Sequence, residues 1–202
     1  LPDDTGIRHP GRCIAVLMEA QAVPDPAAHM LEVGDVAAVM AIAAEAGEPL
    51  QVFRAVEALA QKTLRFRQLS VFRYIDETAE VERIHSTNQG SHAPGGRKRL
   101  ADYPHNQAVL ARGEIYVARD RNAVAHAYKD AESLFALGIT SIMNVPIRHG
   151  GHNLGALNVM GEAGWYSQAC FTNARTVAGL LVPTLLTFRL QPRPDQHVAP
   201  SS

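Results

Sequence analysis

Within residues 137–160, two segments alternate at every second position, which is the spacing of one face of a β-strand. A Gly-Gly pair divides this stretch in two, and glycine tolerates the positive φ that short hairpin turns require. Gly138, which has no Cβ, is suited to closing a helix just before the first strand. The pattern therefore predicts a helix end followed by a β-hairpin. The positions that alternate are Ile142, Asn144, Pro146, Asn158 and Met160.

Asn144 and Asn158 are unexpected within these apolar strands. A buried amide costs free energy unless its polar atoms find hydrogen-bond partners. On adjacent antiparallel strands the two asparagines can face each other as a structural pair, or one of them can contact a ligand. Asn144 is the stronger candidate for ligand contact.

The remaining pattern predicts helices that alternate with hairpins. Asp35 is a candidate N-cap, and Pro49 is placed to open a helix whose apolar residues fall at helical spacing. Pro183 is expected to kink the last helix because proline lacks a backbone donor. The expected helices are 36–46, 50–64, 104–112, most of 122–137, and 167–190; the expected strands are 69–75, 81–87, 114–117 and the hairpin just described.

Composition narrows the classes of partner that we expect for this protein. The 202-residue chain has 47% hydrophobic and 19% charged residues, with a formal net charge of −1. Because no excess of one charge is available, neither nucleic acid nor a membrane surface is an expected partner. Cys13 and Cys170 lie far apart and match neither a disulfide framework nor a metal-binding spacing. We therefore expect a reduced, cytoplasmic setting and no metal site.

The hairpin stretch resembles the C-terminal hairpin of the GAF family. This resemblance implies an α+β fold, related to the PAS fold, in which helices flank an antiparallel sheet. The resemblance covers roughly residues 48–190, the core of a predicted domain at 34–190, and it does not extend to residues 1–47. Composition separately predicts a loosely structured arm at 1–33 and a disordered tail at 191–202. The residues that match the family pattern are Leu137, Gly138, Ser141, Val145, Pro146, Gly151, Leu154, Gly155 and Leu157.

The resemblance also implies a ligand pocket between the sheet and the connection that follows the second strand. Arg83 and His85 are expected to share one strand face by alternation. There they form either a cationic pair for a carboxylate or phosphate, or a solvent-exposed pair in which Arg83 meets a surface acid. The predicted ligand-binding residues are Tyr74, Arg83, His85, Tyr103, Asn106, Arg119, Tyr128, Ser141 and Asn144, and the candidate catalytic bases are His85, His105 and His126.

Other motifs are weaker. Residues 88–98 are rich in glycine but lack the spacing of a phosphate-binding loop, so we expect a lid or a plain connection. His149 and His152 flank the Gly-Gly turn and are interpreted as solvent-exposed turn residues. The cysteine pattern does not fit the free methionine sulfoxide reductases, which share the family fold, and the motifs of bilin-binding members are absent from the sequence.

Three functional hypotheses follow. The first is a bacterial sensory module that binds a small, possibly anionic molecule and passes the signal on through another protein or a homodimer formed by its terminal helices. The second is a metal-independent enzyme that acts on a small acidic metabolite with histidine and arginine residues. The third is haem binding through a pocket histidine; otherwise no cofactor is predicted.

Overall fold

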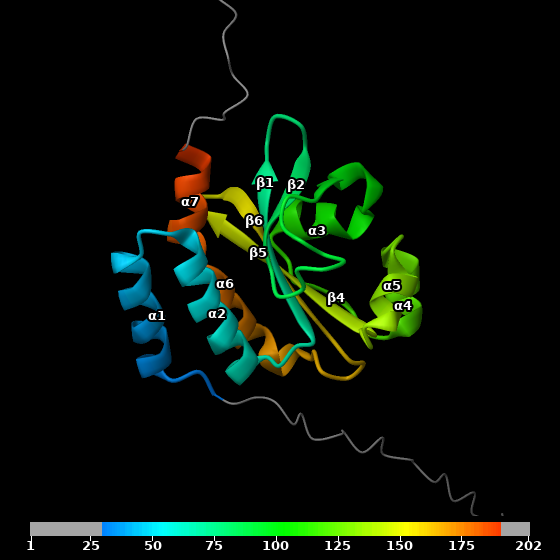
Figure 1. The fold of residues 1–202 in the computed structure, drawn as a ribbon. Coiled ribbons are helices and arrows are strands. Elements are labelled where there is room, and N and C mark those ends of the chain that lie inside the picture. The colour runs from blue at the N-terminus through cyan, green and yellow to red at the C-terminus, as the bar shows by residue number, and fades with distance from the viewer. Residues whose placement is uncertain (1–29, 191–202) are drawn as a thin grey trace, which may run out of the picture.

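The computed structural model describes residues 30–190, so most of the predicted arm and all of the predicted tail lie outside the described residues. A six-stranded antiparallel sheet forms the centre, in the order β3-β2-β1-β6-β5-β4 (Figure 1). Two hairpins supply its four central strands, as predicted, and two short strands flank them. The strands are β1 (Gln68–Ile75), β2 (Glu80–Ser86), β3 (Arg97–Arg99), β4 (Tyr116–Ala118), β5 (Ser141–His149) and β6 (His152–Gly161).

Three helices lie over one face of the sheet, which we call the helix face: α2 (Pro49–Thr63), α6 (Phe171–Gly179) and α7 (Val182–Leu190). A fourth helix, α1 (Val33–Glu45), packs against α2 at the outer edge of the molecule. The apolar stripe of α2 packs against alternate residues of the strands, including Leu69, Leu157 and Val159, which are fully buried. The predicted last helix is interrupted just before Pro183, and its two parts are bent by 45°. This interruption is the expected effect of proline on a helix.

Three short helices and a 3₁₀ turn lie over the opposite face, which we call the pocket face. They are η1 (Leu100–Asp102), α3 (Pro104–Arg112), α4 (Arg121–Ala127) and α5 (Ala131–Ala136). Figure 1 shows α3, α4 and α5 on the side of the sheet away from α1 and α2. The predicted helix 122–137 is thus two helices, separated near Tyr128. The predicted loop after β2 contains a short strand, β3, which pairs with β2.

The turn predictions agree with the backbone. Gly150 and Gly151 have φ values of 55° and 81°, and Gly138 follows α5 with a φ of 72°. The amide of Ile139 donates to the carbonyl of Leu134, so the glycine completes a helix-closing motif. The predicted cap is wrong, however: Glu32 is the N-cap of α1, and Asp35 lies in the first turn, where Lys62 donates to its carboxylate at 2.8 Å.

Among residues 30–190, no single helix is long and apolar enough to cross a membrane, and only the bent pair α6–α7 satisfies the length and composition requirements when its parts are joined.

Candidate functional site

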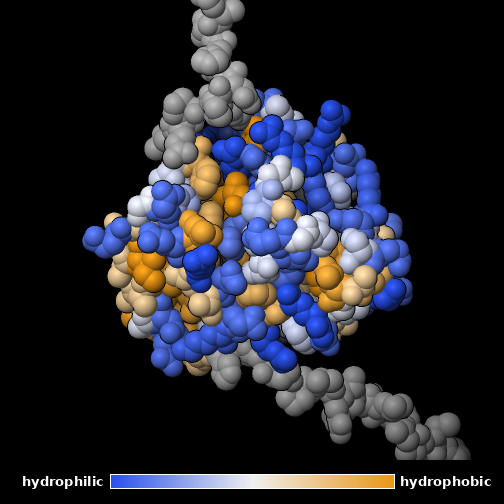
Figure 2. All heavy atoms as spheres, in the orientation of Figure 1, coloured by the Kyte–Doolittle hydropathy of each residue, from blue (hydrophilic) through white to orange (hydrophobic). Residues whose placement is uncertain are grey.

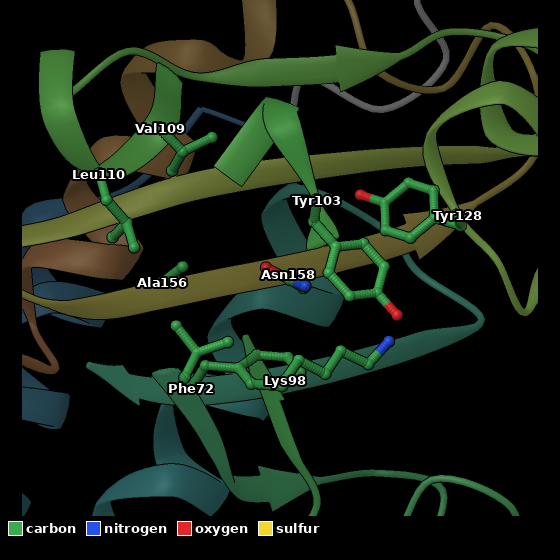
Figure 3. A pocket seen from close by; sticks show the side chains of 9 residues that line it. Phe72, Lys98, Tyr103, Val109, Leu110, Tyr128, Ala156 and Asn158 are labelled. Carbon is green, nitrogen blue, oxygen red and sulfur yellow. The ribbon is translucent and has the colours of Figure 1, made fainter. Parts of the chain in front are cut away.

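A small two-part pocket lies between the pocket face and the elements that cover it. Its first part opens between the sheet and α3, and its second part between the sheet and the α4–α5 connection. Four residues line both parts: Phe72, Lys98, Tyr128 and Asn158. Figure 3 shows the Lys98, Tyr103 and Asn158 side chains approaching one another in the first part. Strands of the sheet, including the edge strand β3, and the helices that cover them therefore contribute side chains to one small polar region, which apolar side chains surround.

The pocket is nearly filled by its own side chains. A water-sized sphere can be centred within about 30 Å³ of the first part and about 20 Å³ of the second. Such a volume holds one or two water molecules. Room for a metabolite therefore requires the lining side chains, or the elements that cover the pocket face, to move.

Asn144 and Asn158 lie directly opposite each other on β5 and β6, as the alternation allowed. Asn144 already has a strong partner, because the hydroxyl of buried Tyr128 donates to its Oδ1 at 2.6 Å. Burial raises the pKa of the Tyr128 hydroxyl, so this donor stays protonated. Asn144 and Tyr128 thus form a structural pair across the pocket wall.

Asn158 is different. Its Oδ1 is buried and has no hydrogen-bond partner among residues 30–190. A buried acceptor without a donor costs free energy. The position that the sequence ranked second is therefore the asparagine better placed to accept a bond from a ligand.

Two cations and one carboxylate line the same pocket. Arg83 is 8% exposed; its guanidinium lies 5.1 Å from the Phe72 ring centre, and one terminal nitrogen donates to the Ala93 carbonyl. The Lys98 ammonium donates to Asp130 Oδ2 at 3.3 Å. Arg83 Nε and Asp130 Oδ1 are both buried without a partner in the described part of the chain. The group carries an excess of positive charge.

Two histidines stand beside these charges and are held neutral. Burial, followed by the charge of Arg83, lowers the pKa of His92, which lies 3.9 Å from Asp130. Burial, reinforced by Lys98, lowers the pKa of His105 to about 4. The His105 ring stacks on Tyr116 and contacts Tyr128. At neutral pH neither histidine adds positive charge to the pocket.

The prediction that Arg83 and His85 share one face is wrong. The β1–β2 register shifts at this point, so that Val71 faces His85 while Phe72 faces Arg83, and Ile84 is an extra residue in β2. His85 consequently lies on the helix face, where its Nε2 is 3.2 Å from Glu57 and its ring stacks on Phe53. A β-bulge reverses the alternation on which the prediction rested.

The other predicted site residues are distributed over several places. Tyr103 and Tyr128 line the pocket, and Tyr74 packs beside it against the cluster that contains Phe72. The hydroxyl of Ser141 is used structurally, because it donates to the Ala118 carbonyl at 2.9 Å. Arg119 and His126 are exposed, and the side chain of Asn106 on α3 is outside the described part of the structure.

Four polar pocket residues were absent from the predicted ligand-binding set: His92, Lys98, Asp130 and Asn158, the last of which the sequence ranked behind Asn144. Lys98 lies in β3 opposite Val81, so it faces the pocket while Arg97 and Arg99 are exposed. Only recognition of that short strand could have singled out Lys98 among three consecutive basic residues. Asp130 lies between α4 and α5, in a segment that was predicted to be helical.

The GAF domain family model matches residues 48–181, which is well over half of the chain. The chain belongs to the GAF domain family. This GAF domain matches no curated protein sequence significantly.

Three solved structures share its architecture, and two of them are described as GAF domains. The GAF domain of a phosphoenolpyruvate-protein phosphotransferase from Coxiella burnetii is similar with a TM-score of 0.63 and 19% identity, over 78% of this chain and 94% of that one. The corresponding Acinetobacter domain has a TM-score of 0.61 and 16% identity, over 80% and 96%. The chromophore-binding domain of an R. palustris bacteriophytochrome has a TM-score of 0.59 and 9% identity, over 78% and 62%. At these identities the likeness establishes the fold.

Proposed function

We propose that this GAF domain is a sensory or regulatory module that binds a small anionic molecule between its sheet and the β3–α3 segment. GAF domains typically act as small-molecule-binding modules. The observation that carries the proposal is the pair of cations, Arg83 and Lys98, on a largely apolar pocket with only Asp130 to balance them. Arginine in an apolar surround binds a carboxylate or phosphate strongly, since little water competes for it.

The near absence of free space supports a sensory role. We expect ligand entry to move the connection from β3 to α3, which ion pairs link to the α4–α5 connection: Lys98 with Asp130 and Lys129 with Asp102, the latter at 3.1 Å. Binding therefore changes the position of this segment on the surface. Such a ligand-dependent surface is what a partner protein can recognise.

Native mass spectrometry of the purified protein, followed by thermal melts with a panel of small carboxylates and phosphates, tests this proposal. We expect at least one anion to raise the melting temperature, and Arg83→Met to abolish the shift. Arg119→Met is the matched control, because Arg119 is exposed and outside the pocket; it should retain the shift. Equal responses of the wild-type protein and Arg83→Met would contradict the proposal.

The enzyme hypothesis receives no comparable support, because its candidate bases lie apart. His85 is on the helix face, His126 is exposed, and His105 has a pKa of about 4. A base with so low a pKa is a weak proton acceptor at neutral pH.

We also propose that a second copy of the chain packs against α1. Only Val39 of this helix is buried, whereas Met40 and Ile42 are 59% and 41% exposed. Figure 2 shows apolar residues gathered on the left, over α1. A helix so apolar is usually covered by another surface.

Sedimentation experiments test the proposed dimer. Met40→Glu should shift a dimer to monomer, whereas Leu137→Glu, at an exposed apolar position outside α1, should not. A monomeric wild-type protein would contradict the proposal.

A further inference from the structure

From the unpaired polar atoms of the pocket we infer a narrower ligand class: a small monoanion that also carries a neutral N–H donor, such as an N-acyl or carbamoyl amino acid. This inference rests on the proposed function, because it names the chemistry of the same pocket. It adds a requirement that positive charge alone does not impose, namely a donor in the ligand.

Two of the unpaired atoms are acceptors. Asn158 Oδ1 and Asp130 Oδ1 are buried, line the second part of the pocket together, and have no donor among the residues that the structure describes. The oxygen identity of Asp130 does not depend on how an amide is oriented, so at least one acceptor is certain in kind. A ligand with only oxygen acceptors would leave both atoms unsatisfied and would place lone pairs against them.

The third unpaired atom, Arg83 Nε, is a donor. Its terminal nitrogen Nη1 donates to the Ala93 carbonyl, which fixes the guanidinium, while Nε stays without a partner among the described residues. An anionic oxygen of the ligand satisfies this atom with a charge-assisted hydrogen bond. Arg83, Asp130 and Asn158 line the same pocket part, so we expect a single small molecule to meet both needs.

The charge balance distinguishes a neutral donor from an ammonium group. Arg83 and Lys98 are cationic, Asp130 is anionic, and burial lowers the pKa of His92 so that it is neutral near pH 7. A monoanion with an amide or urea N–H cancels the remaining positive charge. A zwitterion has no net charge and leaves this excess uncompensated within a low-dielectric site.

Calorimetric titration with matched probes tests the inference. N-acetylglycine supplies a carboxylate and an amide N–H, acetoxyacetate replaces that N–H with an ester oxygen, and N-acetylglycinamide removes the charge. We expect N-acetylglycine to bind about 10-fold more tightly than either analogue, since each analogue loses one buried interaction. It should also bind more tightly than 4-aminobutanoate, whose donors are on an ammonium group.

Asn158→Leu sharpens the test because it removes an acceptor but no charge. In this variant the preference for N-acetylglycine over acetoxyacetate should fall by several fold while the preference over N-acetylglycinamide remains. Equal binding of amide and ester to the wild-type protein, with both lost in Arg83→Met, would overturn the donor requirement and leave the anion-binding function intact. Binding of none of the probes at millimolar concentration would overturn the inference, whereas the anion panel and native mass spectrum judge the proposed function separately.

Discussion

The two faces of the central sheet carry different kinds of side chain, although the same strands form both. On the helix face, Leu69, Leu157 and Val159 are completely buried against α2, α6 and α7, in a continuous apolar core. On the pocket face, the central strands carry Ser70, Asn144 and Asn158. The helix face buries mainly apolar side chains, whereas the pocket face also buries polar atoms, several of which have no partner in the part of the chain that the structure describes.

This difference indicates that the helix face supplies stability and that the pocket face serves function. A dry, close-packed face tolerates little change in volume, whereas a polar face with unpaired atoms gives up stability that a ligand can restore. Substitutions on the helix face should therefore destabilise the protein, while some on the pocket face should be neutral or stabilising when no ligand is bound.

The largest effect is expected from Gly155→Ala. An added Cβ would lie 1.9 Å from the Phe72 carbonyl oxygen and 2.9 Å from the Leu185 side chain, so the β1 backbone or α7 has to shift. We expect a loss of about 3 kcal/mol or more in the free energy of unfolding, measured by urea denaturation. Gly47→Ala is the control, because nothing lies within 4 Å of its added Cβ. A wild-type midpoint for Gly155→Ala would contradict the packing described for β6.

The asparagine pair tests the pocket face directly. Asn144→Leu leaves the buried Tyr128 hydroxyl without its acceptor and should cost about 2 kcal/mol. Asn158→Leu, at the opposite position on β6, removes an acceptor that has no partner within the described chain, and should change stability by less than about 0.5 kcal/mol or increase it. Each variant controls for the other in chemical denaturation. Equal losses would show that both asparagines are structural.

The pH dependence should show a smaller contribution from the same face. His105 has a pKa of about 4 in the folded protein, against 6.5 as its ordinary value, so the unfolded chain binds more protons between these limits. The stability due to neutral His105 is complete above pH 6.5 and is lost as the pH falls toward 4. His105→Gln should reduce this loss by about 1–2 kcal/mol in denaturation at pH 7 and pH 4.5. Exposed His126→Gln is the control, and an unchanged pH slope in His105→Gln would contradict the assignment.

Much of the fold could be predicted from local signals. The Gly150-Gly151 turn, the left-handed Gly138 and the Pro49 helix start depend on backbone conformations that only a few residue types favour, so the sequence identifies them directly. The alternation in β5 and β6 likewise placed Asn144 and Asn158 in one register on one face. These signals require no knowledge of what packs against them.

The errors at the candidate site have a common physical origin. The bulge at Ile84 separates Arg83 from His85, yet it leaves no mark in the sequence, because it depends on how β1 and β2 fit their neighbours. Likewise β3 is three residues long and is a strand only because β2 offers it an edge. Without that strand, Lys98 could not be assigned to the pocket.

By itself the sequence determined the order of elements, the turns, the apolar faces and the family, since these follow from side-chain periodicity and from the conformational limits of glycine and proline. Only the tertiary structure decided which polar groups meet. The Tyr128 hydroxyl donates to Asn144, whereas Asn158 Oδ1 has no partner among residues 30–190. The break between α4 and α5 brings Asp130 to Lys98, 32 residues away in the chain. Hydrogen bonds are short and directional, so partners distant in the chain become known only once the chain has folded.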